Sequence, residues 1–185
     1  DFIQVDWTRK GWPAYRVSMM QYLIKGAALE DYYCWGERVY APCDGMVVVA
    51  EDGYAEKKTN LLTDVFKAYK NANYFDPYKD NIQCIAGNYM IIQYAKNVYA
   101  ALCHLQKDSV QVTVGQYVKA GDYVGNVGHS GNSFAPHLHF QLMDSRDITK
   151  ANGLPCAFRE YEIFIDGLWK EVKDGVPTNR DRIRF

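Results

Sequence analysis

The stretch 135–142 reads APHLHFQL and carries two histidines two positions apart. Side chains alternate between the two faces of an extended strand, so His137 and His139 are predicted to point one way and Leu138 and Phe140 the other. Two imidazoles on one face, backed by an apolar face, suit a metal ligand beside a second group that handles protons. A pair of hydrogen-bonded histidines on a half-buried strand fits the same pattern. The choice between these two interpretations depends on the rest of the chain.

Short β-type runs punctuated by Gly and Asp surround this stretch. The runs 88–95 (NYMIIQYA) and 98–105 (VYAALCHL) are separated only by Lys96-Asn97, which predicts a hairpin. The run 112–128 (VTVGQYVKAGDYVGNVG) has regularly spaced glycines, which favour tight turns between very short strands. Such glycine runs are also similar to lipoyl- and biotin-carrier barrels, but the chain has no lysine in the Met-Lys-Met setting of those carriers.

Upstream segments complete a mainly β pattern. The run 15–24 (YRVSMMQYLI) is predicted to be a strand, and 38–53 a hairpin with Asp44-Gly45 as its turn. In 59–72 (TNLLTDVFKAYKNA), apolar residues share one helical face, which predicts an amphipathic helix. We interpret this helix as part of an insertion over residues 54–84.

The C-terminal residues 150–185 are predicted to form an extension built on a hairpin, with Asp166-Gly167 as its turn. The whole chain, 1–185, is therefore expected to be a single antiparallel β-sheet domain, barrel-like in shape, with a small helical insertion. Its length is sufficient for one domain with a sizeable core.

The composition limits the classes of function. The formal net charge is −1, from 21 basic and 22 acidic side chains, so no basic field points to nucleic acid as a partner. No apolar run approaches the ~20 residues that a membrane helix needs. The sequence starts at Asp1 without a recognisable leader, which we interpret as a mature or trimmed form, so no targeting signal indicates the compartment.

Only four histidines are available for chemistry. By strand alternation, His104 is predicted to share a face with Ala100 and Leu102. His129 lies in a glycine-rich loop, and the other two are His137 and His139. A histidine alone at the edge of a core would need no function, but three at the ends of neighbouring β-type runs indicate a shared site.

An ordered set of motifs runs through the chain: GERVYAPCDGMVVVA at 36–50, GNYMIIQY at 87–94, a long run over 99–133, and PHLHFQL at 136–142. Together they resemble the M23 family of zinc metallopeptidases, the LytM/lysostaphin type that cleaves peptide cross-links in bacterial cell walls. The resemblance covers about two-thirds of the chain. It implies a β domain of the duplicated hybrid motif kind and an extracytoplasmic location, in the periplasm, in the cell wall or as a secreted protein.

The resemblance also implies roles for the histidines. His139 matches a zinc ligand, and His137 and His104 match the two other histidines, which orient or activate water and stabilise an oxyanion. Zinc would lower the pKa of its water toward ~7 and polarise the scissile carbonyl. His129 stands where the family usually has Asn or a similar residue, and is expected at the rim of the substrate groove. From composition and loop position, Tyr32, Tyr33, Trp35 and the helix near 60–71 are expected to form the walls of this groove.

The chain departs from the family pattern at the first two zinc ligands, a His-x-x-x-Asp motif on an early strand. No histidine precedes His104. One alignment makes Asp31, eight residues before Val39, the ligand carboxylate and leaves Ala27 where the histidine should stand. The other places the ligand strand at 18–24, which has no carboxylate. We favour the second, in which Asp31 is an ordinary loop residue.

Cys34 is a further candidate ligand, because zinc accepts mixed Cys, His and carboxylate sets. The commoner fate of a free cysteine is to act as a small buried apolar residue. With His139 as one good ligand and Asp31 and Cys34 as speculative partners, weak or absent zinc binding is expected.

Two functions of different classes remain open. The first is a catalytically degenerate domain that binds peptidoglycan peptides or regulates a cell-wall hydrolase. The second is an active zinc endopeptidase that cleaves peptidoglycan cross-links with an altered ligand set of Asp31, Cys34 and His139. The retained histidines favour the second function. The missing first ligand favours the first, and we give it more weight because coordination chemistry tolerates little change.

Overall fold

The computed structural model describes residues 1–56, 59, 69 and 81–185. The chain folds as two compact units, Asp1–Gly153 and Leu154–Phe185. The expected amphipathic helix at 59–72, and most of the insertion assigned to 54–84, lie outside the described residues.

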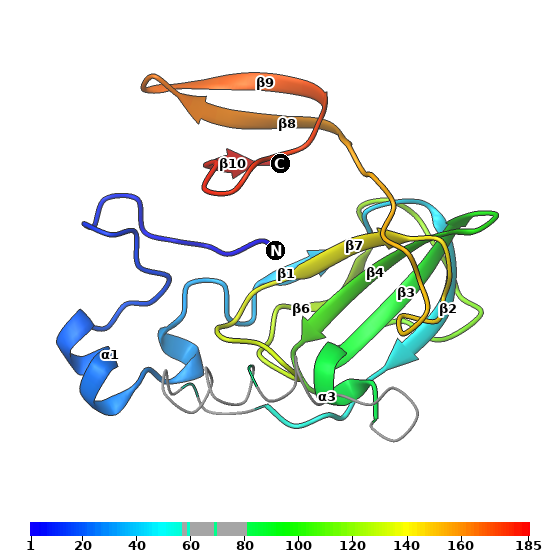
Figure 1. Ribbon diagram of the computed structural model, residues 1–185, viewed down its shortest axis with the longest axis horizontal. Coiled ribbons are helices and arrows are strands. Elements are labelled where there is room, and N and C mark those ends of the chain that lie inside the picture. The colour runs from blue at the N-terminus through cyan, green and yellow to red at the C-terminus, as the bar shows by residue number, and fades with distance from the viewer. Residues whose placement is uncertain (57–58, 60–68, 70–80) are drawn as a thin grey trace. The chain divides into compact units, whose positions relative to one another are not determined.

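A five-stranded antiparallel sheet forms the centre of the first unit (Figure 1). Its spatial order is β5 (Tyr117–Val118), β2 (Gly45–Glu51), β3 (Asn88–Ala95), β4 (Val98–Leu105) and β7 (His139–Met143). The prediction of a mainly antiparallel β fold is confirmed. The described strands form open sheets, so the barrel-like closure suggested for the fold is not seen among them.

The hairpin β3–β4 forms as predicted, with Ala95 paired to Val98 and Asn97 in the turn at φ 57°. Both faces of the sheet are covered by buried apolar side chains, as the near-continuous hydrophobic runs of these two strands require. One core cluster includes Met90, Ile92, Leu102 and Leu105, and the opposite one includes Ile91, Ala101, Cys103 and Met143.

The hairpin predicted over 38–53 is wrong. Strand β1 (Arg38–Tyr40) pairs with β6 (Tyr123–Asn126), whereas β2 pairs with β3 and β5. The Asp44 carboxylate accepts a hydrogen bond from the Ala120 amide at 2.8 Å, so it orders a distant turn. Gly45 is needed for a different reason, because a Cβ there would collide with the Gln93 carbonyl oxygen of β3.

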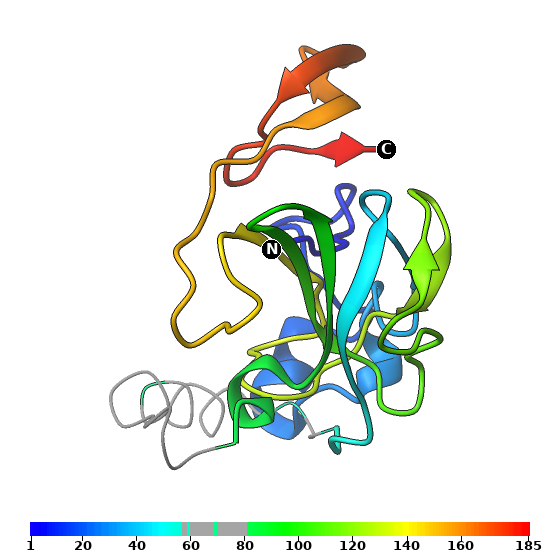
Figure 2. The same cartoon turned by 90° about the vertical axis from the view of Figure 1, so that its right-hand side faces the viewer.

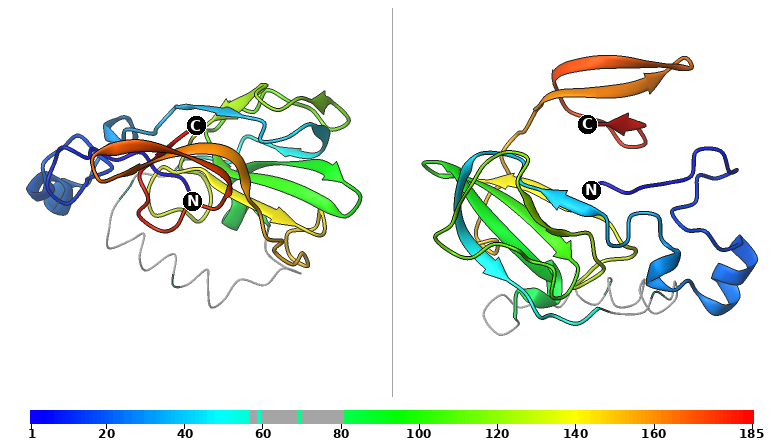
Figure 3. Two further views of the ribbon diagram at one scale, coloured as in Figure 1. Left: turned by 90° about the horizontal axis from the view of Figure 1, so that it is seen from above. Right: turned by 180° about the vertical axis from the view of Figure 1, so that it is seen from behind.

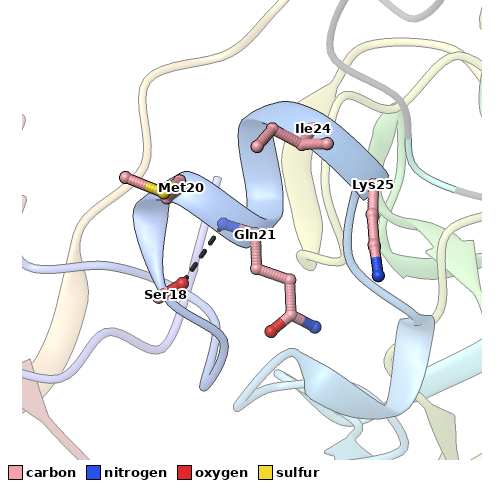
Figure 4. A pocket seen from close by; sticks show the side chains of 5 residues that line it. All are labelled: Ser18, Met20, Gln21, Ile24 and Lys25. Carbon is pink, nitrogen blue, oxygen red and sulfur yellow. Dashed lines mark hydrogen bonds between the residues drawn. The ribbon is translucent and has the colours of Figure 1, made fainter.

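The strand predicted at 15–24 is also wrong, because this segment contains helix α1 (Met19–Lys25). Ser18 caps the helix by accepting from the Gln21 amide at 3.1 Å, and Gly26 ends it at φ 76°. The apolar run that suggested a strand is exposed, with Met20 72% and Ile24 73% accessible. A hollow of about 290 Å³ on this helix is lined by Ser18, Met20, Gln21, Ile24 and Lys25 (Figure 4).

Two short helical turns flank the sheet. The 3₁₀ helix η1 (Leu29–Asp31) contains Asp31, which was expected to be an ordinary loop residue. Helix α3 (Gln83–Ala86) leads into β3 through Gly87 at φ 68° and lies at one end of that strand, as Figure 2 shows. No described helix has the length and hydropathy to cross a membrane.

The second unit is a three-stranded antiparallel sheet of order β10 (Ile183–Arg184), β8 (Phe158–Ile165) and β9 (Leu168–Gly175), shown in Figure 3. The predicted hairpin is confirmed, with Asp166 at φ 55° and Gly167 at φ 80° in its turn. Trp169 of β9 packs against Phe164 with ring centroids 5.2 Å apart, and Arg184 lies 4.3 Å from the Trp169 ring centroid. Cation–π contacts of this kind stabilise a small sheet that has little core of its own.

Candidate functional site

The two histidines of APHLHFQL lie on one side of the sheet edge, as predicted. A single carboxylate oxygen of Asp1 lies 2.7 Å from Nδ1 of His139 and 3.6 Å from Nε2 of His137. Leu138 and Phe140 pack against the opposite side, on the core cluster that contains Leu102. The strand also has a backbone neighbour, because Phe2 and Leu138 exchange hydrogen bonds of 2.8 and 3.0 Å.

His104 joins these two histidines through an irregularity in β4. Its φ is 62°, a left-handed conformation in which histidine is enriched several-fold over most residues other than glycine. The pairing of β3 with β4 shifts between Asn88 and Met90, and the alternation of faces breaks there. The prediction that His104 shares a face with Leu102 is therefore wrong. Its ring lies 4.8 Å from that of His137 and 6.0 Å from that of His139 (centroid distances). We call these three residues the histidine cluster.

Backbone carbonyls fix the proton positions of two rings in the cluster. Nδ1 of His104 lies 2.9 Å from the Ser130 carbonyl oxygen, and Nδ1 of His137 lies 2.8 Å from that of Ala135. A carbonyl oxygen can only accept, so both rings donate from Nδ1. The Nε2 atom of each neutral ring then carries a lone pair, which makes both histidines acceptors toward a ligand.

The cluster is neutral at neutral pH. Burial lowers the pKa of His104 to about 3, with a smaller contribution from the neighbouring His137. Burial also lowers the pKa of His137 and of His139. The contact between His139 and Asp1 is accordingly a hydrogen bond from a neutral ring to a carboxylate.

His129 does not lie at the rim of a groove, because it is fully buried. Its backbone amide donates to Glu56 at 2.8 Å, and its Nδ1 lies 3.0 Å from the Ser133 hydroxyl oxygen. Ser133 lies in turn 3.1 Å from Nδ1 of His137. His129 is therefore linked to His137 through the Ser133 hydroxyl, inside the protein.

The other candidate ligands are engaged in the loop that carries them. The Asp31 carboxylate accepts from the Ala28 amide at 2.9 Å, within the same turn of 3₁₀ helix. Cys34 is buried in a core cluster, its thiol donates to the Pro136 carbonyl at 2.9 Å, and burial raises its pKa. Both features favour the protonated thiol over the thiolate that a metal needs.

Tyr33 and Trp35, the expected wall residues, are half-buried neighbours of Cys34. The Tyr33 hydroxyl donates to Asp6 at 3.3 Å, and the Arg16 guanidinium lies 4.7 Å from its ring centroid. The hollow on α1 is lined by other residues, so it is a separate feature from these side chains and from the histidine cluster.

The residues do not fit a catalytic zinc ion, which in proteins is held by three side chains with one position open. Within residues 1–56, 59, 69 and 81–185, no three His, Cys, Asp or Glu side chains are grouped so that they could hold a metal. His139 donates from Nδ1 to Asp1, so only its Nε2, which lies 3.3 Å from the Gln141 side-chain oxygen, has a lone pair for a metal.

Sequence reasoning missed the residues that surround the cluster. Asp1 is 138 positions from His139, and no local pattern connects them. Ser130 and Ser133 could have been suspected, because both stand in the glycine-rich loop just before the histidine pair. Their hydrogen bonds, however, depend on the folded path of that loop.

The family model for peptidase family M23 matches residues 30–151, about two-thirds of the chain. The chain belongs to peptidase family M23. It is 38% identical over 58 residues to the peptidoglycan DD-endopeptidase ShyA of Vibrio cholerae, which covers 31% of this chain and 13% of that protein. It is 58% identical over 40 residues to lysostaphin of Staphylococcus simulans, covering 22% and 8%. This M23 domain thus spans a small fraction of the length of these relatives.

Solved structures of M23 peptidases were also found. The catalytic domain of lysostaphin from Staphylococcus simulans is 25% identical, with 77% of this chain and 84% of that chain covered and a TM-score of 0.42. A zinc-containing peptidase from Vibrio cholerae is 20% identical, with 82% and 37% covered and a TM-score of 0.41.

Proposed function

We propose that this M23 domain binds peptides of peptidoglycan at the histidine cluster and does not cleave them with a bound zinc ion. The observation that carries the proposal is the set of side chains that could serve as metal ligands. No histidine precedes His104 in the sequence, and the part of the chain that the structure describes offers no group of three metal-ligating side chains. The peptidoglycan endopeptidases among the relatives supply the class of ligand.

The chemistry of the cluster suits peptide recognition. His104 and His137 present neutral Nε2 acceptors, and the exposed Asp1 carboxylate beside them is a third acceptor. Amide N–H groups and the ammonium groups of a wall peptide are matching donors. When bound in this family, zinc supplies Lewis-acid polarisation of the scissile carbonyl, which neutral imidazoles do not replace.

We expect a soluble cross-linked muropeptide to bind in the presence of a chelator. Isothermal titration should give the same affinity with and without EDTA. The variant His137→Ala should bind at least about tenfold more weakly, as expected for a lost hydrogen bond in a desolvated site. Arg159→Ala, on an exposed residue of the second unit, is the matched control and should bind like the wild type. Binding that is abolished by EDTA would contradict the proposal.

A cell-wall hydrolase is the second partner that we propose for the same surface, because regulation of such an enzyme needs recognition without cleavage. Peptidoglycan and a cell-wall hydrolase would both require an extracytoplasmic location. In the titration, failure of the muropeptide to bind would direct the search to a protein partner.

One observation favours a second function, a zinc endopeptidase with an altered ligand set. The rings of His137 and His139 lie 4.8 and 6.0 Å from that of His104, and three histidines together are more than a binding surface requires. This function would need Asp31 to release the Ala28 amide and Cys34 to release Pro136. It would also need a thiolate at Cys34 against the effect of burial, and we therefore place this function second.

A further inference from the structure

Helix α1 turns an apolar face to solvent. Four large apolar side chains on this face are 60–73% accessible: Met19, Met20, Leu23 and Ile24. At about 3.6 residues per turn, their positions fall within an arc of about 140°. Tyr22, outside this arc, holds the helix to the protein by stacking on Tyr15 at a centroid distance of 4.3 Å. A surface helix ordinarily turns its apolar face to the core, so an apolar face in solvent indicates a binding surface.

The segment that carries this face is mainly positive. Residues 1–26 contain four basic and two acidic side chains, whereas the whole chain contains 21 and 22. The two carboxylates, of Asp1 and Asp6, already accept hydrogen bonds from neighbouring groups. Lys25 lines the hollow on α1 together with Ile24 (Figure 4). A cationic group therefore borders the apolar face, which favours a partner that is both apolar and anionic.

The loop 6–13 lies at the same end of the first unit as α1 (Figures 1 and 3). The Arg9 guanidinium attaches it to the residues before the helix, because it donates to the Tyr15 and Val17 carbonyl oxygens at 2.9 and 3.1 Å. Trp12 of this loop is 47% accessible and has φ 48°, a left-handed conformation that is costly for a bulky side chain. Strain of this kind is typical of functional positions, and tryptophan is enriched where a membrane meets water.

We propose that α1 and the loop 6–13 form a docking surface for a bilayer that contains anionic lipid. The apolar side chains of α1 would enter the boundary between headgroups and acyl chains, with Trp12 at the same depth. The exposed Lys10 and Lys25 would stay at the level of the lipid phosphates. A second copy of this chain is a poorer occupant, because a symmetric contact between two such faces would bring their lysines together.

Co-sedimentation of the whole chain with lipid vesicles tests the proposal. Vesicles of phosphatidylcholine mixed with phosphatidylglycerol should bind the protein at least about fivefold more strongly than vesicles of phosphatidylcholine alone, because lysines are attracted to an anionic surface. High salt should reduce this difference, since it screens the attraction. Equal binding to the two kinds of vesicle would overturn the inference.

Substitutions on α1 test the surface itself. Leu23→Gln with Ile24→Gln should weaken binding to the anionic vesicles by at least about tenfold, because two apolar side chains no longer leave water. Lys25→Glu should weaken it by at least about fivefold. The matched controls are Leu168→Gln, at a position 65% accessible in the second unit, and Lys96→Glu, in an exposed turn. Both controls should bind like the wild type, and a double variant that binds like the controls would overturn the inference.

Sedimentation velocity without lipid tests the other occupant. A wild-type monomer supports the bilayer, whereas a wild-type dimer that Leu23→Gln with Ile24→Gln converts to a monomer overturns the inference. This inference goes beyond the proposed function and does not rest on it, because the hollow on α1 is lined by residues outside the histidine cluster. A wild type that binds anionic vesicles but no muropeptide would support the docking surface and contradict the proposed ligand alone.

Discussion

Gly131→Ala is expected to lower the free energy of unfolding by at least about 3 kcal/mol. Gly131 has φ 71°, and this left-handed conformation alone costs a residue with a Cβ about 1–2 kcal/mol. The added Cβ would also lie 2.5 Å from the Ile85 carbonyl oxygen and still closer to the Gly87 amide nitrogen. Both are backbone atoms, so the loop would have to move away from the start of β3.

That movement would break hydrogen bonds that support the histidine cluster. The Asn132 amide donates to Ile85 at 2.9 Å, and the Asn88 amide donates to the Ser130 hydroxyl at 2.9 Å. Each is worth about 1 kcal/mol, and Ser130 also anchors His104. Urea denaturation measures the change. Gly121→Ala is the matched control, since φ is 89° there but nothing lies within 4 Å of the added Cβ. Equal losses in the two variants would contradict the close approach.

Acidification from pH 6.5 to 5 is expected to lower the stability of the protein by about 2 kcal/mol through His104 alone. Burial lowers the pKa of His104 to about 3, whereas the unfolded chain has a value near 6.5. Between these values the unfolded state binds a proton that the folded state does not. The free energy of unfolding therefore falls by about 1.4 kcal/mol per pH unit in this window and is constant above it.

His104→Asn is the variant that isolates this effect. Asparagine tolerates the left-handed backbone at φ 62° and can donate to the Ser130 carbonyl, but it does not titrate in this range. Its stability should depend less steeply on pH than that of the wild type between pH 6.5 and 5, by urea denaturation at each pH. His137 and His139, whose pKa values are lowered in the same direction, contribute to the slope that remains, and Glu56, whose pKa is raised by burial, acts against it. Parallel curves for wild type and variant would show that His104 is not held neutral by burial.

Local patterns predicted the elements that depend on neighbours in sequence. The hairpin β3–β4 needed only two apolar runs and the Lys96-Asn97 turn, and the shared face of His137 and His139 needed only strand alternation. Helix α1 was missed because its run of Met, Leu and Ile was interpreted by hydrophobicity, whereas the cap at Ser18 is the decisive signal. Because 18–24 contains a helix, there is no longer a reason to place the strand with the zinc ligands there. In the other alignment the ligand is Asp31, whose carboxylate accepts a hydrogen bond from the Ala28 amide.

Features that join distant parts of the chain could not be predicted. The pairing of β1 with β6 joins residues about 85 positions apart, and the hydrogen bond between Asp44 and Ala120 joins residues 76 positions apart. The position of His104 depends on one left-handed residue that interrupts alternation. Alternation alone would have turned this ring toward Leu102. The burial of His129 follows from the fold of the loop, since its sequence is as polar as that of an exposed turn.

The central claim is that this M23 domain works without a zinc ion, and direct titration of Zn²⁺ into metal-free protein tests it. We predict no stoichiometric binding in the sub-micromolar range, and no difference between the wild type and His139→Ala. Metal analysis of protein purified without chelators should agree, with zinc at background. One equivalent of tightly bound zinc in the wild type that is lost in His139→Ala would contradict the account and establish an altered ligand set instead.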